Sequence, residues 1–239
     1  MKTLILDIET IGEPFEAIDP ETQEHLTKRI RRDASNEEEY QELLEQTKKE
    51  LGLSPLTGEV IVIGLTDYAT HQSTVYFQAP ESDIPDRFSE GEVTYIKTTE
   101  RGMLRSFWDI ARNYNTFVTF SGWQFDIPFL NIRSALNRIK PSQNLMVNRF
   151  LNNQRTGVFH IDLQDQLSYY AAVKKKGSLH MWSRAIGIES PKTEGVLAED
   201  VSKLFYAGKY LDIARYNARD IKATEQLFDF WDTYLNLGR

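Results

Sequence analysis

The chain has 239 residues, 41% of them hydrophobic, which is enough to bury one substantial core of sheet and helices without requiring a second domain. It contains no cysteine, so disulfides and thiolate metal sites are excluded and any metal must be held by oxygen or imidazole ligands. Its formal net charge of −7 excludes the uniformly basic surface that phosphate binding usually requires.

The first predicted element is a buried strand over residues 3–8, built from Leu4, Ile5, Leu6 and Ile8. Asp7 and Glu9 are expected at its C-terminal end. The apolar run is too short for a signal peptide, and no later segment is long enough to span a membrane. We therefore expect a cytoplasmic protein without membrane contacts.

A helical insertion is predicted at about residues 13–52, within a single domain of residues 1–239. Asp19 followed by Pro20 is typical of a helix start, with the acid as N-cap and proline at the first helical position. Asn36 can cap a second helix, whose first turn is acidic and which ends at Gly52.

The remaining elements predict an α/β fold with a mixed central sheet flanked by helices. Strands are expected over 59–68, 73–78 and 92–97, as a mostly antiparallel meander, and a helix over 99–113 leads into a strand over 116–120 parallel to the first. The second half then looks largely helical, with helices over 127–139, 163–170, 178–186, 201–207 and 211–235.

The charge is unevenly distributed along the chain. From Ile127 to Ile188 there are nine basic residues and two acidic ones, Asp162 and Asp165, so this stretch carries 9 − 2 = +7. The remainder carries −14. Such polarity favours an anionic polymer on one face, and the alternative is an ordinary solvated surface.

Two carboxylates on the first strand are the first candidate site. Asp7 and Glu9 are separated by one residue, so both side chains point to the same face. Hard cations such as Mg²⁺ or Mn²⁺ would offset their repulsion. A solvated strand end is the alternative reading.

Two later acids extend the pattern. Asp126 follows Ser121-Gly122 and directly precedes Ile127-Pro128, where it could equally be a helix N-cap. Tyr216 and Asp220 lie four residues apart in the last predicted helix, so they share one face.

Taken in order, these segments resemble the three motifs of the DEDDy 3′–5′ exonuclease superfamily. They are Asp7-Ile8-Glu9-Thr10, then Ser121-Gly122 with Phe125-Asp126, then Tyr216-x-x-x-Asp220. The likeness is to the proofreading exonuclease domain of family B DNA polymerases and its stand-alone bacterial relatives, and it implies a three-layer ribonuclease H-like fold. Ser121 departs from the family, which usually has asparagine before the glycine.

The resemblance implies hydrolysis of single-stranded nucleic acid, DNA in preference to RNA, from a free 3′ end. It implies two divalent cations, Mg²⁺ or Mn²⁺, held by Asp7, Glu9, Asp126 and Asp220, with Tyr216 orienting the attacking water. Two cations can stabilise both the attacking and the leaving oxygen of the phosphodiester. With an ordinary pKa near 10, Tyr216 suits hydrogen bonding better than proton abstraction. The sequence does not identify protein partners.

Several neighbouring residues are weaker candidates for nucleic-acid contacts. Trp123 could stack on a base or pack in the core, Thr10 could meet the terminal nucleotide or simply follow a strand, and Asp162 could cap the helix starting at Leu163. His160 could touch substrate or metal. The candidate contacts to nucleic acid are Thr10, Ser121, Trp123, Phe125, Lys174, Lys175, Lys176 and Lys192.

Three alternatives remain open at this point. A catalytically silent binding module of the same fold would keep the surface without turnover. A ribonuclease H-type endonuclease uses similar acids, although Tyr216-x-x-x-Asp220 favours the exonuclease branch. A dedicated exoribonuclease also remains open, because no element reads a 2′-hydroxyl recognisably.

Overall fold

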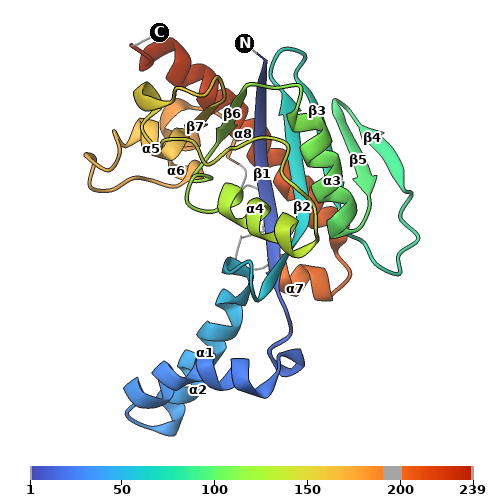
Figure 1. Cartoon of the computed structure of the whole chain (residues 1–239), viewed down its shortest axis with the longest axis vertical. Coiled ribbons are helices and arrows are strands. Elements are labelled where there is room, and N and C mark those ends of the chain that lie inside the picture. Colours follow the sequence, from blue (N-terminus) through green and yellow to red (C-terminus); the bar gives the residue numbers. More distant parts are fainter. Residues whose placement is uncertain (1, 191–200, 238–239) are drawn as a thin grey trace.

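A seven-stranded mixed sheet forms the centre of the computed structural model, which describes residues 2–190 and 201–237 (Figure 1). The strand order is β4-β5-β3-β2-β1-β6-β7. The strands are β1 (Thr3–Gly12), β2 (Gly58–Asp67), β3 (Gln72–Phe77), β4 (Arg87–Glu90), β5 (Val93–Lys97), β6 (Thr116–Thr119) and β7 (Phe159–Asp162).

Helices cover both faces of the sheet, which confirms the predicted α/β architecture. They are α3 (Glu100–Ala111), α4 (Asp126–Leu136), α5 (Leu163–Leu167), α6 (Leu179–Ile186), α7 (Val201–Tyr206) and α8 (Tyr210–Tyr234), with a short 3₁₀ turn η3 (Leu151–Asn153). Within the described residues, no helix is both long and apolar enough to cross a membrane.

The side chains of β1 point alternately to the two helical layers on opposite faces of the sheet. Leu4, Leu6 and Ile8 pack in one core with α3 and α4, whereas Ile5 packs with α8. Successive side chains of a strand point to opposite faces, so Asp7 and Glu9 face the layer that contains α8.

The first strand is longer than predicted, and its acids lie inside it. β1 continues to Gly12, with its pairing to β2 shifted between Glu9 and Thr10. The prediction that Asp7 and Glu9 end the strand is therefore wrong. Carboxylates are unusual inside strands, and here the ladder with β2 holds the backbone extended despite them.

The meander was also predicted incorrectly beyond β3. β2 pairs antiparallel with β1 and β3, but β5 pairs parallel with β3 and antiparallel with the edge strand β4. β6 runs parallel to β1, as predicted. The second half is less helical than predicted because β7 extends the sheet beside β6.

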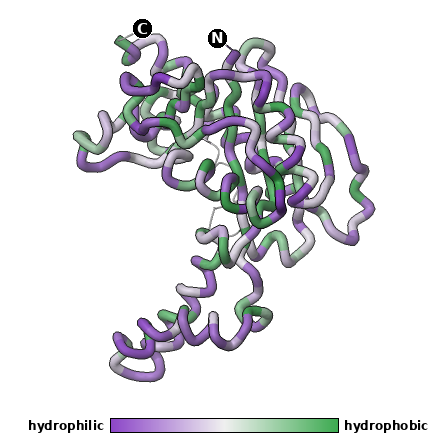
Figure 2. The backbone as a smooth tube through the Cα atoms, in the orientation of Figure 1, coloured by the Kyte–Doolittle hydropathy of each residue, from purple (hydrophilic) through white to green (hydrophobic). Residues whose placement is uncertain are grey.

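The insertion between β1 and β2 contains two helices, α1 (Pro20–Asp33) and α2 (Glu37–Glu50), flanked by the short turns η1 (Phe15–Ala17) and η2 (Leu51–Leu53). Both predicted caps are confirmed: Asp19 accepts from the Thr22 N–H at 3.0 Å and Asn36 from the Glu39 N–H at 2.9 Å. The pair extends away from the sheet and is mostly hydrophilic (Figure 2).

The insertion joins the sheet through a narrow neck made by Gly12, Gly52 and Gly58. Gly12 and Gly58 are register partners of β1 and β2, and a Cβ on any of the three glycines would overlap neighbouring backbone or Leu51. The Thr10 hydroxyl donates to the Gly52 carbonyl at 2.7 Å. The neck therefore depends on residues without side chains.

Candidate metal-binding site

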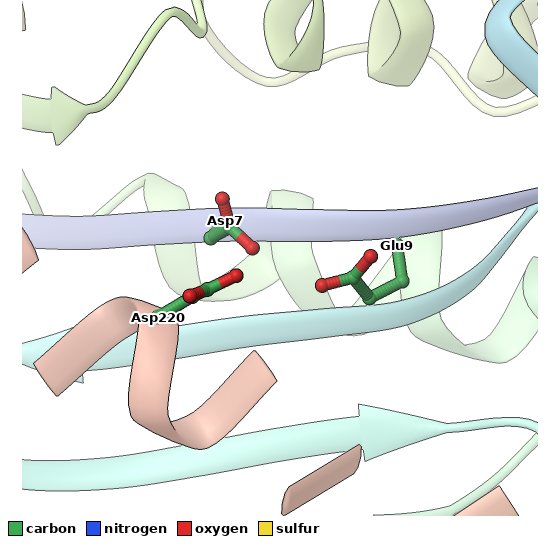
Figure 3. A group of neighbouring side chains, drawn as sticks. All are labelled: Asp7, Glu9 and Asp220. Atoms are coloured by element: carbon green, nitrogen blue, oxygen red, sulfur yellow. The ribbon is translucent and has the colours of Figure 1, made fainter. Parts of the chain in front are cut away.

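Three carboxylates meet between β1 and α8. One oxygen from each of Asp7, Glu9 and Asp220 lies within 4.8 Å of the others, and Figure 3 shows the three groups turned toward one another. Glu9 and Asp220 are buried and Asp7 is partly buried. The structure thus brings together three of the four predicted metal ligands.

The electrostatics of this cluster are unfavourable without a counterion. Burial raises the pKa of Asp7 well above its ordinary value, and the neighbouring carboxylates of Asp126, Glu9 and Asp220 raise it further. Burial and Asp220 likewise raise the pKa of Glu9. Oxygen ligands this close suit a hard divalent cation, so the donor set fits the metal that was predicted.

Asp126 lies beside the cluster at the start of α4. Its Oδ1 accepts from the Ile8 N–H at 3.1 Å, and burial raises its pKa to about 7, with Asp162 and Asp220 adding to the rise. The alternative that Asp126 is a helix N-cap is wrong, because Phe125 occupies the cap position and Asp126 is the first helical residue.

Tyr216 is buried on the same face of α8 as Asp220. Burial raises the pKa of its phenol, and the charges of Asp220 and Glu9 together with a hydrogen bond to Asp220 raise it further. The phenol is therefore protonated at neutral pH. It is therefore better suited to donating a hydrogen bond than to accepting a proton.

Asn217 and Gly64 complete the site and were not singled out from the sequence. Asn217 is fully buried, and its Nδ2 donates to Asp7 Oδ2 at 2.8 Å. Gly64 is the register partner of Asp7 on β2. An isolated glycine inside a strand often marks a close approach of another group, and that signal was present in the sequence.

Asp162 holds the loop that leads to Asp126. As predicted, it caps α5, accepting from the Gln164 and Asp165 N–H groups. It also accepts from the N–H groups of Ser121 at 3.0 Å and Trp123 at 2.9 Å. Burial raises the pKa of Asp162, while these backbone hydrogen bonds lower it.

Ser121 has a left-handed backbone, with φ at 67°, a conformation that asparagine tolerates better than serine. The asparagine that usually precedes this glycine in the exonuclease superfamily would therefore suit the backbone conformation, in addition to making a contact to substrate. Gly122 follows because a Cβ there would overlap Thr119.

The aromatic candidates of the loop are largely engaged within the protein. The Trp123 indole N–H donates to the Val147 carbonyl at 3.3 Å, and the Arg149 guanidinium lies 5.4 Å from its ring centroid. Phe125 packs against the core beside Phe129. The His160 side chain is buried, and burial lowers its pKa to about 4, so it is neutral.

The basic stretch is only partly available to a ligand. Arg133 pairs with Glu100 and Arg149 with Asp165, in both cases through two hydrogen bonds. By contrast, Lys174 and Lys175 are exposed and Lys176 is partly exposed. Lys192 lies outside the described residues.

Comparison with known proteins identifies related sequences and folds. The profile of a family described as "Predicted 3'-5' exonuclease related to the exonuclease domain of PolB" matches residues 74–230, more than half of the chain, which confirms the resemblance found in the sequence. No curated protein matches the chain.

Among solved structures, the chain is similar to the family B DNA polymerase from the hyperthermophilic archaeon Pyrobaculum calidifontis. The TM-score is 0.60 at 14% sequence identity, and the match covers 97% of this chain and 24% of the polymerase. At this identity the likeness concerns the fold, and it confirms the predicted ribonuclease H-like class. The chain spans about a quarter of the polymerase.

Proposed function

The chain belongs to the family of predicted 3′–5′ exonucleases related to the exonuclease domain of PolB, and from this we propose that it hydrolyses single-stranded nucleic acid from a free 3′ end. DNA is the proposed substrate in preference to RNA. The observation that carries the proposal is the meeting of Asp7, Glu9 and Asp220 within 4.8 Å.

The proposed metal ligands are Asp7, Glu9, Asp126 and Asp220, which would hold two divalent cations, Mg²⁺ or Mn²⁺. Bound there, the cations would stabilise charge on the attacking and leaving oxygens of the phosphodiester. The protein supplies four carboxylates from β1, α4 and α8, of which Glu9, Asp126 and Asp220 are buried and Asp7 is partly buried.

Tyr216 is proposed to position the attacking water. Its phenol is hydrogen-bonded to Asp220 and close enough to Glu9 and Asp7 for their charges to raise its pKa. While its O–H donates to Asp220, the phenol oxygen can accept a hydrogen bond from a water and so hold it in place. Its contribution is orientation, which lowers the entropic part of the barrier.

The proposed contacts to the rest of the strand lie on the segment before α6. Lys174, Lys175 and Lys176 offer cations to the phosphate backbone. The neighbouring Tyr169 is 57% exposed and adds an aromatic ring on which a base can stack.

The test is digestion of 5′-labelled single-stranded DNA and RNA oligonucleotides with Mg²⁺, Mn²⁺ or EDTA. We expect a metal-dependent ladder that shortens from the 3′ end and disappears in Asp7→Ala. The matched control is Asp229→Ala, which changes an acid of α8 that bonds Tyr68 away from the cluster and should keep the ladder.

Each alternative predicts a different result. Binding of the oligonucleotide without any ladder would leave the catalytically silent module as the function. Faster digestion of RNA than of DNA would make the chain an exoribonuclease. Internal cleavage products would place it with the endonucleases of similar fold.

A further inference from the structure

Asn217 occupies an unusual place for a buried amide. Its side chain is 0% exposed, its Nδ2 donates to Asp7 Oδ2 at 2.8 Å, and its Oδ1 has no hydrogen-bond partner in the described part of the chain. A buried acceptor left unsatisfied costs about 1–3 kcal/mol. A leucine, which has the same branched shape, would avoid that cost, so packing alone does not explain the amide.

The strand opposite Asp7 leaves room for this amide. Gly64 faces Asp7 across the β1–β2 ladder, and a Cβ at Gly64 would overlap Asn217 Oδ1 and come 3.1 Å from Ile221. Glycine inside a strand costs roughly 0.5–1 kcal/mol relative to alanine. Gly64 on β2 and Asn217 on α8 are each unfavourable for stability, yet together they allow the hydrogen bond to Asp7.

The Asn217 amide lies close to the other acids of the cluster as well as to Asp7. Asn217 and Asp220 are three residues apart on α8 and so share a helix face. The Asn217 amide lowers the pKa of Glu9 against the larger effects of burial and Asp220. The same amide thus interacts with both strand carboxylates.

We propose that Asn217 is a positioning residue that fixes the orientation of the Asp7 carboxylate for cation binding, and that Gly64 is required to give it space. The Asn217 amide donates to Asp7 Oδ2, and this hydrogen bond restricts rotation of the carboxylate that meets Glu9 and Asp220. The inference rests on the proposed function, because it assumes that the cluster binds metal.

Preorganisation of this kind has a metal-specific consequence. Mg²⁺ demands near-ideal octahedral geometry, whereas larger cations tolerate distortion better. Loss of the amide is therefore expected to weaken Mg²⁺ binding more than Mn²⁺ binding. Removal of a residue that orients a metal ligand typically costs 10–100-fold in metal affinity.

The experiment measures Mn²⁺ binding by electron paramagnetic resonance and Mg²⁺ binding by competition, in wild type, Asn217→Ala and Asn217→Leu. Leucine keeps the branched shape of the side chain without the donor, so it separates a cavity effect from loss of the hydrogen bond. The control is Thr224→Val, since Thr224 is another buried α8 residue whose side-chain oxygen has no partner among the residues that the structure describes. Circular dichroism establishes that each variant is folded.

We expect both Asn217 variants to bind Mn²⁺ about 10-fold and Mg²⁺ up to about 100-fold more weakly, and Thr224→Val to match wild type. Affinities within twofold of wild type in both variants would overturn the inference while leaving the proposed function intact. A wild type that binds neither ion would overturn the metal site itself.

Substitution of Gly64 provides an independent test of the proposed contact. Gly64→Ala should lower both stability and metal affinity, and combining it with Asn217→Ala should relieve the overlap. The double variant is then expected to be more stable than the sum of the two single losses, yet to bind metal no better than Asn217→Ala. Strictly additive stability losses would contradict the proposed contact.

Discussion

Asp126 and Ile8 join the first turn of α4 to the open edge of β1, through a 3.1 Å hydrogen bond from the Ile8 N–H to Asp126 Oδ1. The edge is open because β6 pairs with β1 only at Thr3, Leu4 and Ile5. The pairing of β6 with β1 thus ends just before Asp7, the first acid of the cluster. One carboxylate both satisfies the free backbone donor and lies beside the acid cluster.

The metal-free protein is expected to lose stability as the pH rises. The pKa of Asp126 is raised by burial from 3.8 to about 7 in the folded state, so its contribution is fully present below about pH 4 and lost as the pH rises through 7. Asp7 and Glu9 shift in the same direction. Thermal melts in EDTA should show a lower Tm at pH 8 than at pH 5.

Two further thermal melts test whether the acid cluster causes this pH dependence of the Tm. Asp220→Asn removes one charge from the cluster and should flatten the pH dependence in EDTA, while abolishing nuclease activity. Mg²⁺ or Mn²⁺ should raise the Tm of wild type at pH 8 but not that of Asp220→Asn. A wild-type Tm that is higher at pH 8 than at pH 5 would contradict the assigned sign.

Tyr216→Phe is expected to reduce kcat roughly 10²-fold even with saturating metal, since misplacing a reacting group can cost about that factor. The pH dependence of the remaining activity should follow that of wild type, because the Tyr216 phenol does not titrate near neutral pH. Single-turnover digestion with saturating Mn²⁺ measures this. A variant that gains activity steeply above pH 8 would instead indicate that the phenol acts as a base.

Asp162→Ala is expected to cost about 2–3 kcal/mol of unfolding free energy, because it removes a helix cap and two hydrogen bonds to the loop before Asp126. It should also lower nuclease activity, since that loop sets the position of Asp126. Asn36→Ala is the matched control: it removes the cap of α2, should cost about 1 kcal/mol, and should leave activity unchanged. Urea unfolding and the ladder assay together distinguish the two.

Replacing Lys174, Lys175 and Lys176 with alanine is expected to weaken binding to single-stranded DNA and to reduce the slope of log K against log salt by about 2, at roughly 0.7 per phosphate contact. Fluorescence anisotropy in EDTA measures this binding without digestion. The control removes the same charge at three exposed positions, Lys2, Lys28 and Lys49. Equal slopes for the two triple variants would assign the binding to overall charge.

The sequence was informative where local chemistry determines structure. The helix caps Asp19 and Asn36 were predicted because a side-chain acceptor next to a helix start acts within three residues. The edge strand β4 and the strand β7 were missed because each has only four residues and lacks the run of β-favouring residues that marks β6. Their pairing depends on partners distant in the chain.

The same distinction holds for the site. Asp7 and Glu9 share a face through strand geometry alone, and Tyr216 and Asp220 through helix geometry, so each pair could be predicted. The contact of Asn217 with Asp7 joins residues 210 positions apart. It becomes visible only when α8 packs across β1 and the missing side chain of Gly64 admits the amide.

The glycine neck has a consequence for how this domain could change. Because Gly12 and Gly58 face each other across an antiparallel ladder, the whole of residues 13–57 is, in topological terms, the loop of a β-hairpin. A two-residue Asn-Gly turn closes such a hairpin, and closure entropy grows only slowly with loop length. We therefore expect that shortening, lengthening or replacing the helical pair leaves the carboxylates of β1 in register with β2.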